Sequence, residues 1–196
     1  MKIWLKKNYT PEQIAYLHSK PTYVIWHYIC DLIKQQKSKN ILDVGCATGA
    51  LNYFLKDYEY NYFGFDTSEY LIDEAKKIWD KPNLHFWCAD WDDFQFEHNC
   101  DCMLLLGVLA YGDSKYCDNN YASAFDLYQI LVNKFKPRQV IIRETDDIYD
   151  VPNSEYDGQK IGIDLEPFIK IADSVKRITV DTTIGKKVIL NVITGI

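Results

Sequence analysis

The stretch from Ile41 to Leu55 constrains the fold of this chain more than any other part. It begins with the mostly apolar run Ile-Leu-Asp-Val, continues through a loop of small residues, and regains apolar residues with helical spacing from Leu51 onwards. This order predicts a strand, a glycine-rich turn and a helix. Gly45 and Gly49 leave room for a close backbone approach or for a positive φ. Such a turn, faced by the N–H groups of the following helix, is typical of the ligand-binding edge of an α/β sheet.

Strands and helices alternate along most of the remaining chain. Two helices are expected before the first strand, one beginning at Thr10 and one following Pro21. The chain closes with apolar runs at 175–181 and 187–193, which a tight turn at Gly185 makes antiparallel. The longest irregular stretch, 145–162, is of the length typical of a functional loop or of a disordered segment. The other expected strands are 60–66, 83–89, 101–106 and 139–144, and the other expected helices are 69–81, 120–134 and 165–172.

The composition limits the possible partners. A chain of 196 residues fits one domain that buries its own core. The net charge is −6 and no run of Lys or Arg exceeds a pair, which argues against nucleic acid, since affinity for its phosphates comes from basic residues. No apolar run approaches the ~20 residues of a membrane span. We therefore expect neither a nucleic-acid nor a membrane partner.

The cysteines and histidines favour a cytoplasmic protein without a metal. The six cysteines form no C-x-x-C pair, and the four histidines have no ligand-like spacing with them. Reduced thiols are therefore expected in place of disulfides or a zinc site. Residues 1–7 are too few and too charged for a signal peptide.

The glycine spacing points to a family. From Gly45 the sequence reads G-C-A-T-G-A, which is not the dinucleotide pattern G-x-G-x-x-G. It resembles the first motif, acidic-x-G-x-G-x-G, of the class I S-adenosylmethionine (SAM)-dependent methyltransferases. Asp43, Gly45 and Gly49 match this motif, whereas Ala47 replaces its middle glycine.

The resemblance extends from about residue 40 to the C-terminus and implies the overall architecture. It implies an α/β fold, a three-layer Rossmann-like sandwich with a mostly parallel seven-stranded sheet and a C-terminal antiparallel hairpin. We expect a single domain over 1–196, with an N-terminal helical cap at 1–38 and the Rossmann-like core at 39–196.

Acidic residues at two further strand ends fit the same cofactor. Asp66 follows Gly45 by 21 residues, where a carboxylate can accept hydrogen bonds from ribose hydroxyls, although a turn or helix cap is the alternative. In the resembled family an acidic residue after the third strand accepts from the adenine amine, and the next side chain often stacks on the ring. Asp90 and Trp91 suit these roles, with core packing as the alternative for Trp91. The full set expected to bind SAM is Asp43, Gly45, Cys46, Ala47, Gly49, Asp66, Thr67, Ser68, Asp90, Trp91, Leu106, Gly107 and Val108.

The acceptor side is predicted from position alone. The segment after the fourth strand lacks Asn/Asp-Pro-Pro-Tyr, the motif of methyltransferases that act on adenine or glutamine amides. Tyr111 either walls the methyl-transfer channel or ends the strand. The side chains of Arg143, Glu144 and Asp146 either orient the acceptor or form an internal ion pair at the strand end. The N-terminal aromatic residues either cap the ligand site or pack on the sheet. The residues expected to bind the acceptor are Tyr9, Tyr23, His27, Tyr111, Arg143 and Glu144, and those expected to take part in catalysis are Tyr111, Glu144 and Asp146.

The sequence therefore predicts an enzyme that transfers a methyl group from SAM to an O or N atom of a small-molecule acceptor and releases S-adenosylhomocysteine (SAH). Two alternatives stay open at this point. One is a catalytically idle SAM-fold protein acting as a partner or regulatory subunit. The other is a different nucleotide-binding enzyme such as an NAD-dependent oxidoreductase, which the missing G-x-G-x-x-G and the closing hairpin disfavour.

Overall fold

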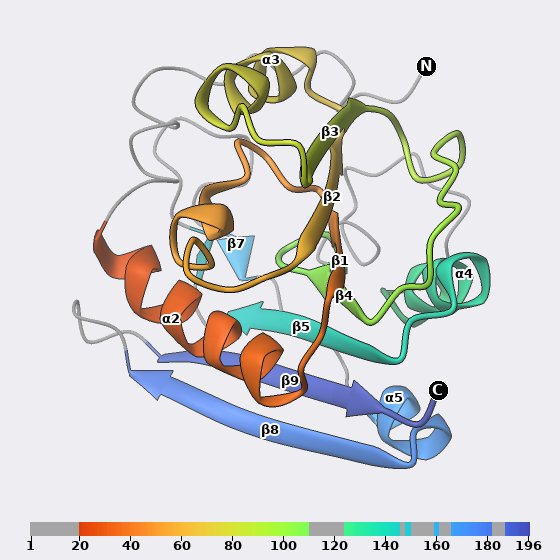
Figure 1. The fold of residues 1–196 in the computed structure, drawn as a ribbon. Helices are drawn as coiled ribbons and strands as arrows, with labels where there is room; N and C mark the ends of the chain where they lie inside the picture. The colour runs from red at the N-terminus through yellow and green to blue at the C-terminus, as the bar shows by residue number, and fades with distance from the viewer. Residues whose placement is uncertain (1–19, 110–123, 146–147, 150–158, 161–165, 182–186) are drawn as a thin grey trace.

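A seven-stranded sheet forms the centre of the molecule (Figure 1). The structure is a computed structural model and describes residues 20–109, 124–145, 148–149, 159–160, 166–181 and 187–196. The strands are β1 (Asn40–Val44), β2 (Asn61–Asp66), β3 (Leu84–Cys88), β4 (Cys102–Leu105), β5 (Gln139–Thr145), β6 (Ile148–Tyr149), β7 (Gln159–Lys160), β8 (Ser174–Asp181) and β9 (Lys187–Thr194). The α-helices are α2 (Lys20–Gln35), α3 (Glu69–Ile78), α4 (Ala124–Phe135) and α5 (Glu166–Ile171), and a 3₁₀ helix, η2, spans Ala50–Tyr53.

The sheet is mostly parallel and ends in a reversed hairpin. Its strand order is β3-β2-β1-β4-β5-β9-β8. Strands β1 to β5 pair in parallel, whereas β9 is antiparallel to both β5 and β8. The chain order reverses direction across the sheet between β1 and β4, the position where ligands bind in sheets of this kind. The predicted fold class, with its closing antiparallel hairpin, is confirmed.

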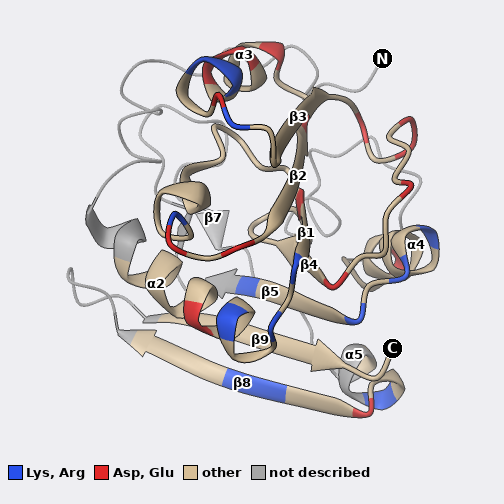
Figure 2. Cartoon of the chain, viewed as in Figure 1, with Lys and Arg blue, Asp and Glu red and all other residues tan. Residues whose placement is uncertain are grey.

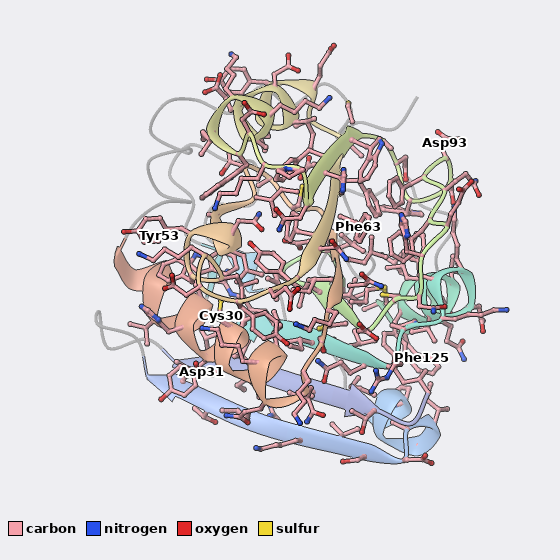
Figure 3. The ribbon with its side chains drawn as sticks, viewed as in Figure 1. Cys30, Asp31, Tyr53, Phe63, Asp93 and Phe125 are labelled. Atoms are coloured by element: carbon pink, nitrogen blue, oxygen red, sulfur yellow. The ribbon has the colours of Figure 1, made fainter. Side chains whose placement is uncertain are left out.

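Helices cover both faces of the sheet and make three layers. The pleat of a strand sends alternate side chains to opposite faces. Ile41 on β1 therefore packs in a core with α2 and η2, while Leu42 packs in a second core with α4. All four residues of β4 are buried, as expected of a central strand covered on both sides. Cys30 of α2 belongs to the first core and Phe63 of β2 to the second, and both are labelled in Figure 3.

The segment after β1 differs from the prediction. A helix was expected from Leu51, but the chain forms only the short 3₁₀ helix η2 and then turns. The Asn52 side chain explains this ending, because both its backbone N and its Nδ2 donate to the carbonyl oxygen of Gly49, at 3.0 and 2.9 Å. In an α-helix that carbonyl would accept from residue 53. Asn52 therefore occupies the acceptor that a longer helix needs.

Two other regions refine the prediction. The stretch 145–162 was expected to be irregular, yet β6 and β7 pair within it as a small antiparallel sheet. Helix α2 begins at Lys20, so Pro21 lies in its first turn, where the missing N–H of proline costs nothing. The helix expected from Thr10 lies outside the described residues. Among the described helices, none is both long enough and apolar enough to cross a membrane.

Candidate functional site

A loop with three positive φ angles follows β1, and we call residues 45–49 the glycine loop. Gly45 (φ 70°), Ala47 (φ 49°) and Gly49 (φ 68°) all lie in the left-handed region. The backbone N atoms of Gly45 and Cys46 both donate to the carbonyl oxygen of Phe65, at 2.9 and 3.1 Å, so the start of the loop is fixed to β2. A left-handed residue with a side chain costs roughly 1–2 kcal/mol. Ala47 therefore keeps the backbone conformation that a glycine would adopt at this position, at an energetic cost.

The two glycines of the loop are required by their neighbours. A Cβ atom on Gly45 would come within 2.7 Å of Cγ2 of Val108, and one on Gly49 within 2.6 Å of Cε1 of Phe86. The first contact places the segment after β4 directly against the loop. Gly107 differs, because its φ of 111° requires glycine while a Cβ atom there would meet no atom within 4 Å. Open space therefore lies beside Gly107, at the end of β4.

Asp66 connects the glycine loop to the turn after β2. Its Oδ2 accepts a hydrogen bond from the backbone N of Ala47 at 3.0 Å, and its Oδ1 accepts from the backbone N of Ser68 at 2.9 Å. Burial raises the pKa of this carboxyl group, and the hydrogen bonds from the backbone of Ser68, Ala47 and Thr67 oppose that rise. A carboxylate offers about four lone-pair positions, so with these three backbone donors Asp66 keeps capacity for about one more donor.

Ser68 has a structural role at the start of α3. Its hydroxyl oxygen accepts from the backbone N of Leu71 at 3.4 Å, which makes Ser68 the N-cap of the helix. Ser68 is thus the N-cap of α3, and Asp66 lies two residues before it. The carbonyl oxygen of Thr67 accepts from Sγ of Cys88 at 3.8 Å, which joins this turn to β3.

Asp43 is a buried carboxyl group directly before the glycine loop. It is 4% exposed, and its Oδ2 accepts a hydrogen bond of 2.6 Å from the hydroxyl of Tyr62. Burial raises the pKa of Asp43 to about 7, the Tyr62 hydrogen bond lowers it, and the negative charge of Asp66 raises it further. Asp43 therefore changes its charge near neutral pH.

Asp90 and Trp91 follow β3 at the same edge of the sheet. The backbone N of Ala89 donates to the carbonyl oxygen of Asp66 at 3.0 Å, so the ends of β2 and β3 lie side by side. Asp90 and Trp91 are each 7% exposed. Trp91 packs in the core on the α4 side, and Nζ of Lys134 contacts its carbonyl oxygen at 2.6 Å. This burial favours the core-packing interpretation of Trp91, and adenine stacking stays a prediction.

The structure brings most of the residues predicted to bind the cofactor to one edge of the sheet, whereas most of those predicted for the acceptor lie outside its described side chains. The ends of β1, β2, β3 and β4 carry the glycine loop, Asp66, Asp90 and the segment 106–108, respectively. Tyr9, Tyr111 and Asp146 lie outside the described residues, and Tyr23 and Glu144 are described only by their backbone. The exposed His27 ring meets Phe54 edge-on, with 4.7 Å between ring centroids, and Arg143 is a partly buried residue of β5.

Several side chains that hold the glycine loop were not predicted. Nε1 of Trp79 donates to the carbonyl oxygen of Thr48 at 2.7 Å, and the hydroxyl of Tyr60 donates to Oδ1 of Asn52 at 2.8 Å. Tyr62 of β2, two residues after Tyr60, donates its hydroxyl hydrogen to Oδ2 of Asp43. The alternation of Tyr60 and Tyr62 was a usable signal, because a buried tyrosine hydroxyl needs a partner.

Metal ligands are not grouped in the part of the chain that the structure describes, where no set of three or more His, Cys, Asp or Glu residues is arranged to hold an ion. The described cysteines, Cys30, Cys46, Cys88, Cys100 and Cys102, are free thiols.

The chain shares its sequence pattern and fold with methyltransferases. Residues 41–128 match a family model described as a methyltransferase domain. The methyltransferase domain of bacterial CtHen1-C is 16% identical, with a TM-score of 0.67 over 89% of this chain and 98% of that chain. The N-methyltransferase NodS from Bradyrhizobium japonicum WM9, in complex with SAH, is 14% identical, with a TM-score of 0.66 over 98% of this chain and 94% of that chain.

A third similar structure is the plantazolicin methyltransferase BpumL in complex with SAH and a triazolic desmethylPZN analog. It is 13% identical, with a TM-score of 0.66 over 94% of this chain and 90% of that chain. No curated protein sequence matches this chain.

The strand order, the reversed last strand and the loop after β1 define a Rossmann-like methyltransferase fold. This fold and the match of residues 41–128 to a methyltransferase-domain model agree with the SAM-dependent methyltransferase family that the sequence resembles.

Proposed function

We propose that this enzyme transfers the methyl group of SAM to an O or N atom of a small-molecule acceptor. The observation that carries the proposal is the meeting of the glycine loop, the Asp66 carboxylate and the segment 106–108 at one edge of the sheet. The open space beside Gly107 and the unused lone-pair capacity of Asp66 fit a ligand that brings a hydroxyl group to this edge.

The described residues divide between the parts of the cofactor. Asp66 accepts hydrogen bonds from the ribose hydroxyls, as carboxylates do at this position of Rossmann-like sheets. Asp90 accepts from the adenine amine, and Trp91 lies beside the ring. The glycine loop and the turn at Gly107 would hold the methionine part. Within this proposal the full cofactor set is Asp43, Gly45, Cys46, Ala47, Gly49, Asp66, Thr67, Ser68, Asp90, Trp91, Leu106, Gly107 and Val108.

The contribution of the protein to the reaction is orientation. When bound, SAM supplies an electrophilic methyl group on a sulfonium. Holding an acceptor in line with such a group accounts for up to ~7–11 kcal/mol of barrier lowering in well-oriented systems. Carboxylates close to the sulfonium would stabilise the ground state more than the transition state, in which the charge is dispersed. The carboxylates of Asp66 and Asp90 therefore act on the ribose and the adenine, away from the methyl group.

A small acceptor is supported by two observations. Figure 2 shows acidic and basic residues interspersed over the described elements, and the net charge of −6 does not favour binding to nucleic-acid phosphates. Among the similar structures, NodS is an N-methyltransferase and BpumL acts on plantazolicin, which makes amines and modified peptides reasonable first acceptors to test. Tyr9, Tyr23, His27, Tyr111, Arg143 and Glu144 are proposed to contact the acceptor, and Tyr111, Glu144 and Asp146 to assist the transfer.

The proposed organisation follows from the same assignment. Residues 39–196 form the Rossmann-like core, and residues 1–38 form a helical cap over the acceptor within the same domain. We also propose that the enzyme acts in the cytoplasm.

The test is a calorimetric titration of the purified protein with SAH, SAM and NAD, followed by transfer of labelled methyl from SAM to amine and hydroxyl acceptors. We expect micromolar binding of SAH and SAM, no binding of NAD, and labelling of a small acceptor. Binding without transfer to any acceptor, including nucleic acids and proteins, would indicate the idle SAM-fold alternative. Transfer to a macromolecule alone would overturn the small-acceptor assignment.

A further inference from the structure

The hydrogen bond between Tyr62 and Asp43 crosses from one strand to the next. In the parallel register of β1 and β2, Ile41 lies opposite Tyr62 and Asp43 lies opposite Gly64. Residues paired in this way, and residues two apart on one strand, share a face of the sheet. Tyr62 must therefore lean forward along β2, over Gly64, to bring its hydroxyl within 2.6 Å of Oδ2 of Asp43.

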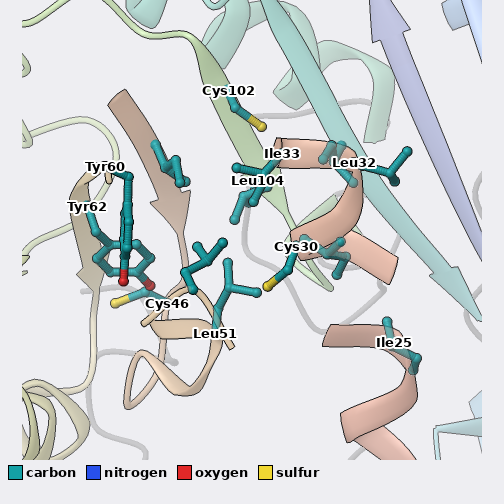
Figure 4. Close-up of a cluster of buried hydrophobic side chains, with 14 of the residues drawn as sticks. Ile25, Cys30, Leu32, Ile33, Cys46, Leu51, Tyr60, Tyr62, Cys102 and Leu104 are labelled. Atoms are coloured by element: carbon teal, nitrogen blue, oxygen red, sulfur yellow. The ribbon is translucent and has the colours of Figure 1, made fainter. Parts of the chain in front are cut away.

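Gly64 makes this path possible. A Cβ atom on Gly64 would lie 2.7 Å from Cε1 of Tyr62 and 2.8 Å from Sγ of Cys46. Figure 4 shows the Tyr62 ring beside Cys46 at the start of the loop after β1. Unlike the glycines of the loop, Gly64 is not among the residues with positive φ, so its role is to leave space. The Tyr62 ring occupies the space that a side chain at residue 64 would need.

The surroundings of Asp43 make this hydrogen bond important. The titratable groups that face Asp43 are Tyr62 and Asp66 from β2, Cys46 from the glycine loop and Cys102 from β4. Among these described groups none is a cation, and Tyr62 is the one whose contact with Asp43 lowers the pKa of Asp43. Burial and the neighbouring carboxylate raise the pKa of Tyr62 well above its usual value, so its hydroxyl keeps its proton near neutral pH.

We infer that Tyr62 is a positioning residue that holds the Asp43 carboxylate in place beneath the glycine loop, through the opening left by Gly64. The inference rests on the proposed function, in which Asp43 and the glycine loop bind SAM. An ionised Asp43 favours a ligand that carries a positive charge, as SAM and SAH do on their amino group, whereas a protonated Asp43 does not. Tyr62 thereby sets the pH range in which the cofactor binds well.

The test compares SAH binding by the wild type and by Tyr62→Phe between pH 6 and pH 9. The substitution removes one hydroxyl and leaves the ring that fills the space above Gly64. Losing a hydrogen bond to a charged group moves the acidic limb of the binding profile up by about one to two pH units. At pH 7 we expect affinity to fall about 5- to 50-fold, and at pH 9 we expect most of it to return. Titration of the ligand amino group is the same for both proteins and cancels in the comparison.

Tyr60→Phe is the matched control. Tyr60 lies directly before β2 and in the same core as Tyr62, but its hydroxyl donates to Asn52 and not to a carboxylate. Its removal therefore leaves the pH midpoint of SAH binding where it is in the wild type. Asp43→Asn, which cannot ionise, should lose the acidic limb, and adding Tyr62→Phe to it should not change the pH dependence.

A second measurement needs no cofactor. Because the pKa of Asp43 in the folded protein, about 7, exceeds its value in the unfolded chain, the folded state binds the proton more tightly. The free energy of unfolding contributed by Asp43 therefore falls as the pH rises from about 4 to about 7 and is level above that. In Tyr62→Phe the free energy of unfolding should keep falling for about one to two further pH units. Urea unfolding at each pH measures this.

The outcomes separate the inference from the proposed function. Equal pH midpoints for SAH binding by the wild type and Tyr62→Phe would overturn the inference and leave the proposed function standing, even if the unfolding profiles differ. Failure of the wild type to bind SAH at any pH would overturn the proposed function, and with it the cofactor role of Tyr62. The unfolding profiles would still report whether Tyr62 controls the ionisation of Asp43.

Discussion

Two carboxylates at the ends of neighbouring strands have different partners. Asp66 accepts hydrogen bonds from two backbone N–H groups, one in the glycine loop and one at the start of α3. Asp43 is more deeply placed and accepts from the hydroxyl of Tyr62. Asp66 thus fixes the glycine loop to the turn before α3, whereas Asp43 is held by a side chain of the neighbouring strand β2.

At this scale, we predict that Asp66→Ala weakens SAH binding by about 1.5–3 kcal/mol, the contribution of hydrogen bonds to a charged group. Calorimetric titration of the folded variant measures the change. Asp93→Ala is the control, because Asp93 is an exposed acidic residue in the turn after Asp90 (Figure 3). If Asp66→Ala bound SAH as tightly as the wild type does, Asp66 would not be a cofactor-binding residue.

A second residue-scale prediction concerns the left-handed alanine of the glycine loop. Ala47→Gly should raise the free energy of unfolding by up to about 1 kcal/mol, because relief of the left-handed strain outweighs the greater flexibility of glycine in the unfolded chain. Thermal or urea unfolding measures this. The opposite change, Gly49→Ala, should destabilise, since its Cβ would collide with Phe86. A loss of stability in Ala47→Gly would show that the Ala47 methyl makes contacts worth more than the strain.

At the scale of elements, the glycine loop is fixed by the segments around it. Trp79 at the end of α3 holds the carbonyl of Thr48, and Asn52 of η2 joins the carbonyl of Gly49 to Tyr60 before β2. The short 3₁₀ helix is therefore a connector between the loop and the sheet. It stays short because Nδ2 of Asn52 donates to the carbonyl oxygen of Gly49, which the backbone N–H of residue 53 would use in an α-helix.

The connection between η2 and β2 predicts a coupled pair. Asn52→Ala leaves the buried hydroxyl of Tyr60 without its acceptor and should cost about 1–3 kcal/mol of stability. Tyr60→Phe leaves Oδ1 of Asn52 unpaired and should also destabilise. In a double-mutant cycle followed by urea unfolding, the double variant should lose less than the sum of the two single losses. Strict additivity would contradict a direct interaction in solution.

At the scale of the whole molecule, the C-terminal hairpin completes the sheet that carries the site. β9 inserts between β5 and β8, so the last strand in sequence is an inner strand. Leu190 of β9 is fully buried in the core shared with α2 and β1. The last strand and the glycine loop therefore share one hydrophobic core.

The inner position of β9 predicts that removing a buried side chain from this strand strongly destabilises the protein. Leu190→Ala should lower the free energy of unfolding by about 2–5 kcal/mol, the usual range for a fully buried leucine, as measured by urea unfolding. Ile196→Ala is the control, since Ile196 is 42% exposed at the C-terminus and should change stability by less than about 0.5 kcal/mol. Similar effects from the two substitutions would contradict an inner position for β9.

Much of the fold was predictable from short-range patterns. The apolar run of β4 predicted a strand buried on both faces, and the turn at Gly185 predicted the reversed hairpin. The strand before Gly45 and the strand that ends at Asp66 were both predicted, whereas the hydrogen bond from Ala47 that joins their ends was found only in the structure. The helix expected after Gly49 was wrong in type, because Asn52 bonds back to the loop, an effect that apolar periodicity does not contain.

The sequence by itself determined the order of strands and helices, the left-handed glycines and the acidic residues at the strand ends, since each depends on residues close together in the chain. Tertiary structure alone decided which side chains meet. It placed Tyr62 over Gly64 and against Asp43, Val108 against Gly45, and Trp91 in the core. These contacts depend on strand register and on the space left by distant residues, and periodicity along one strand specifies neither.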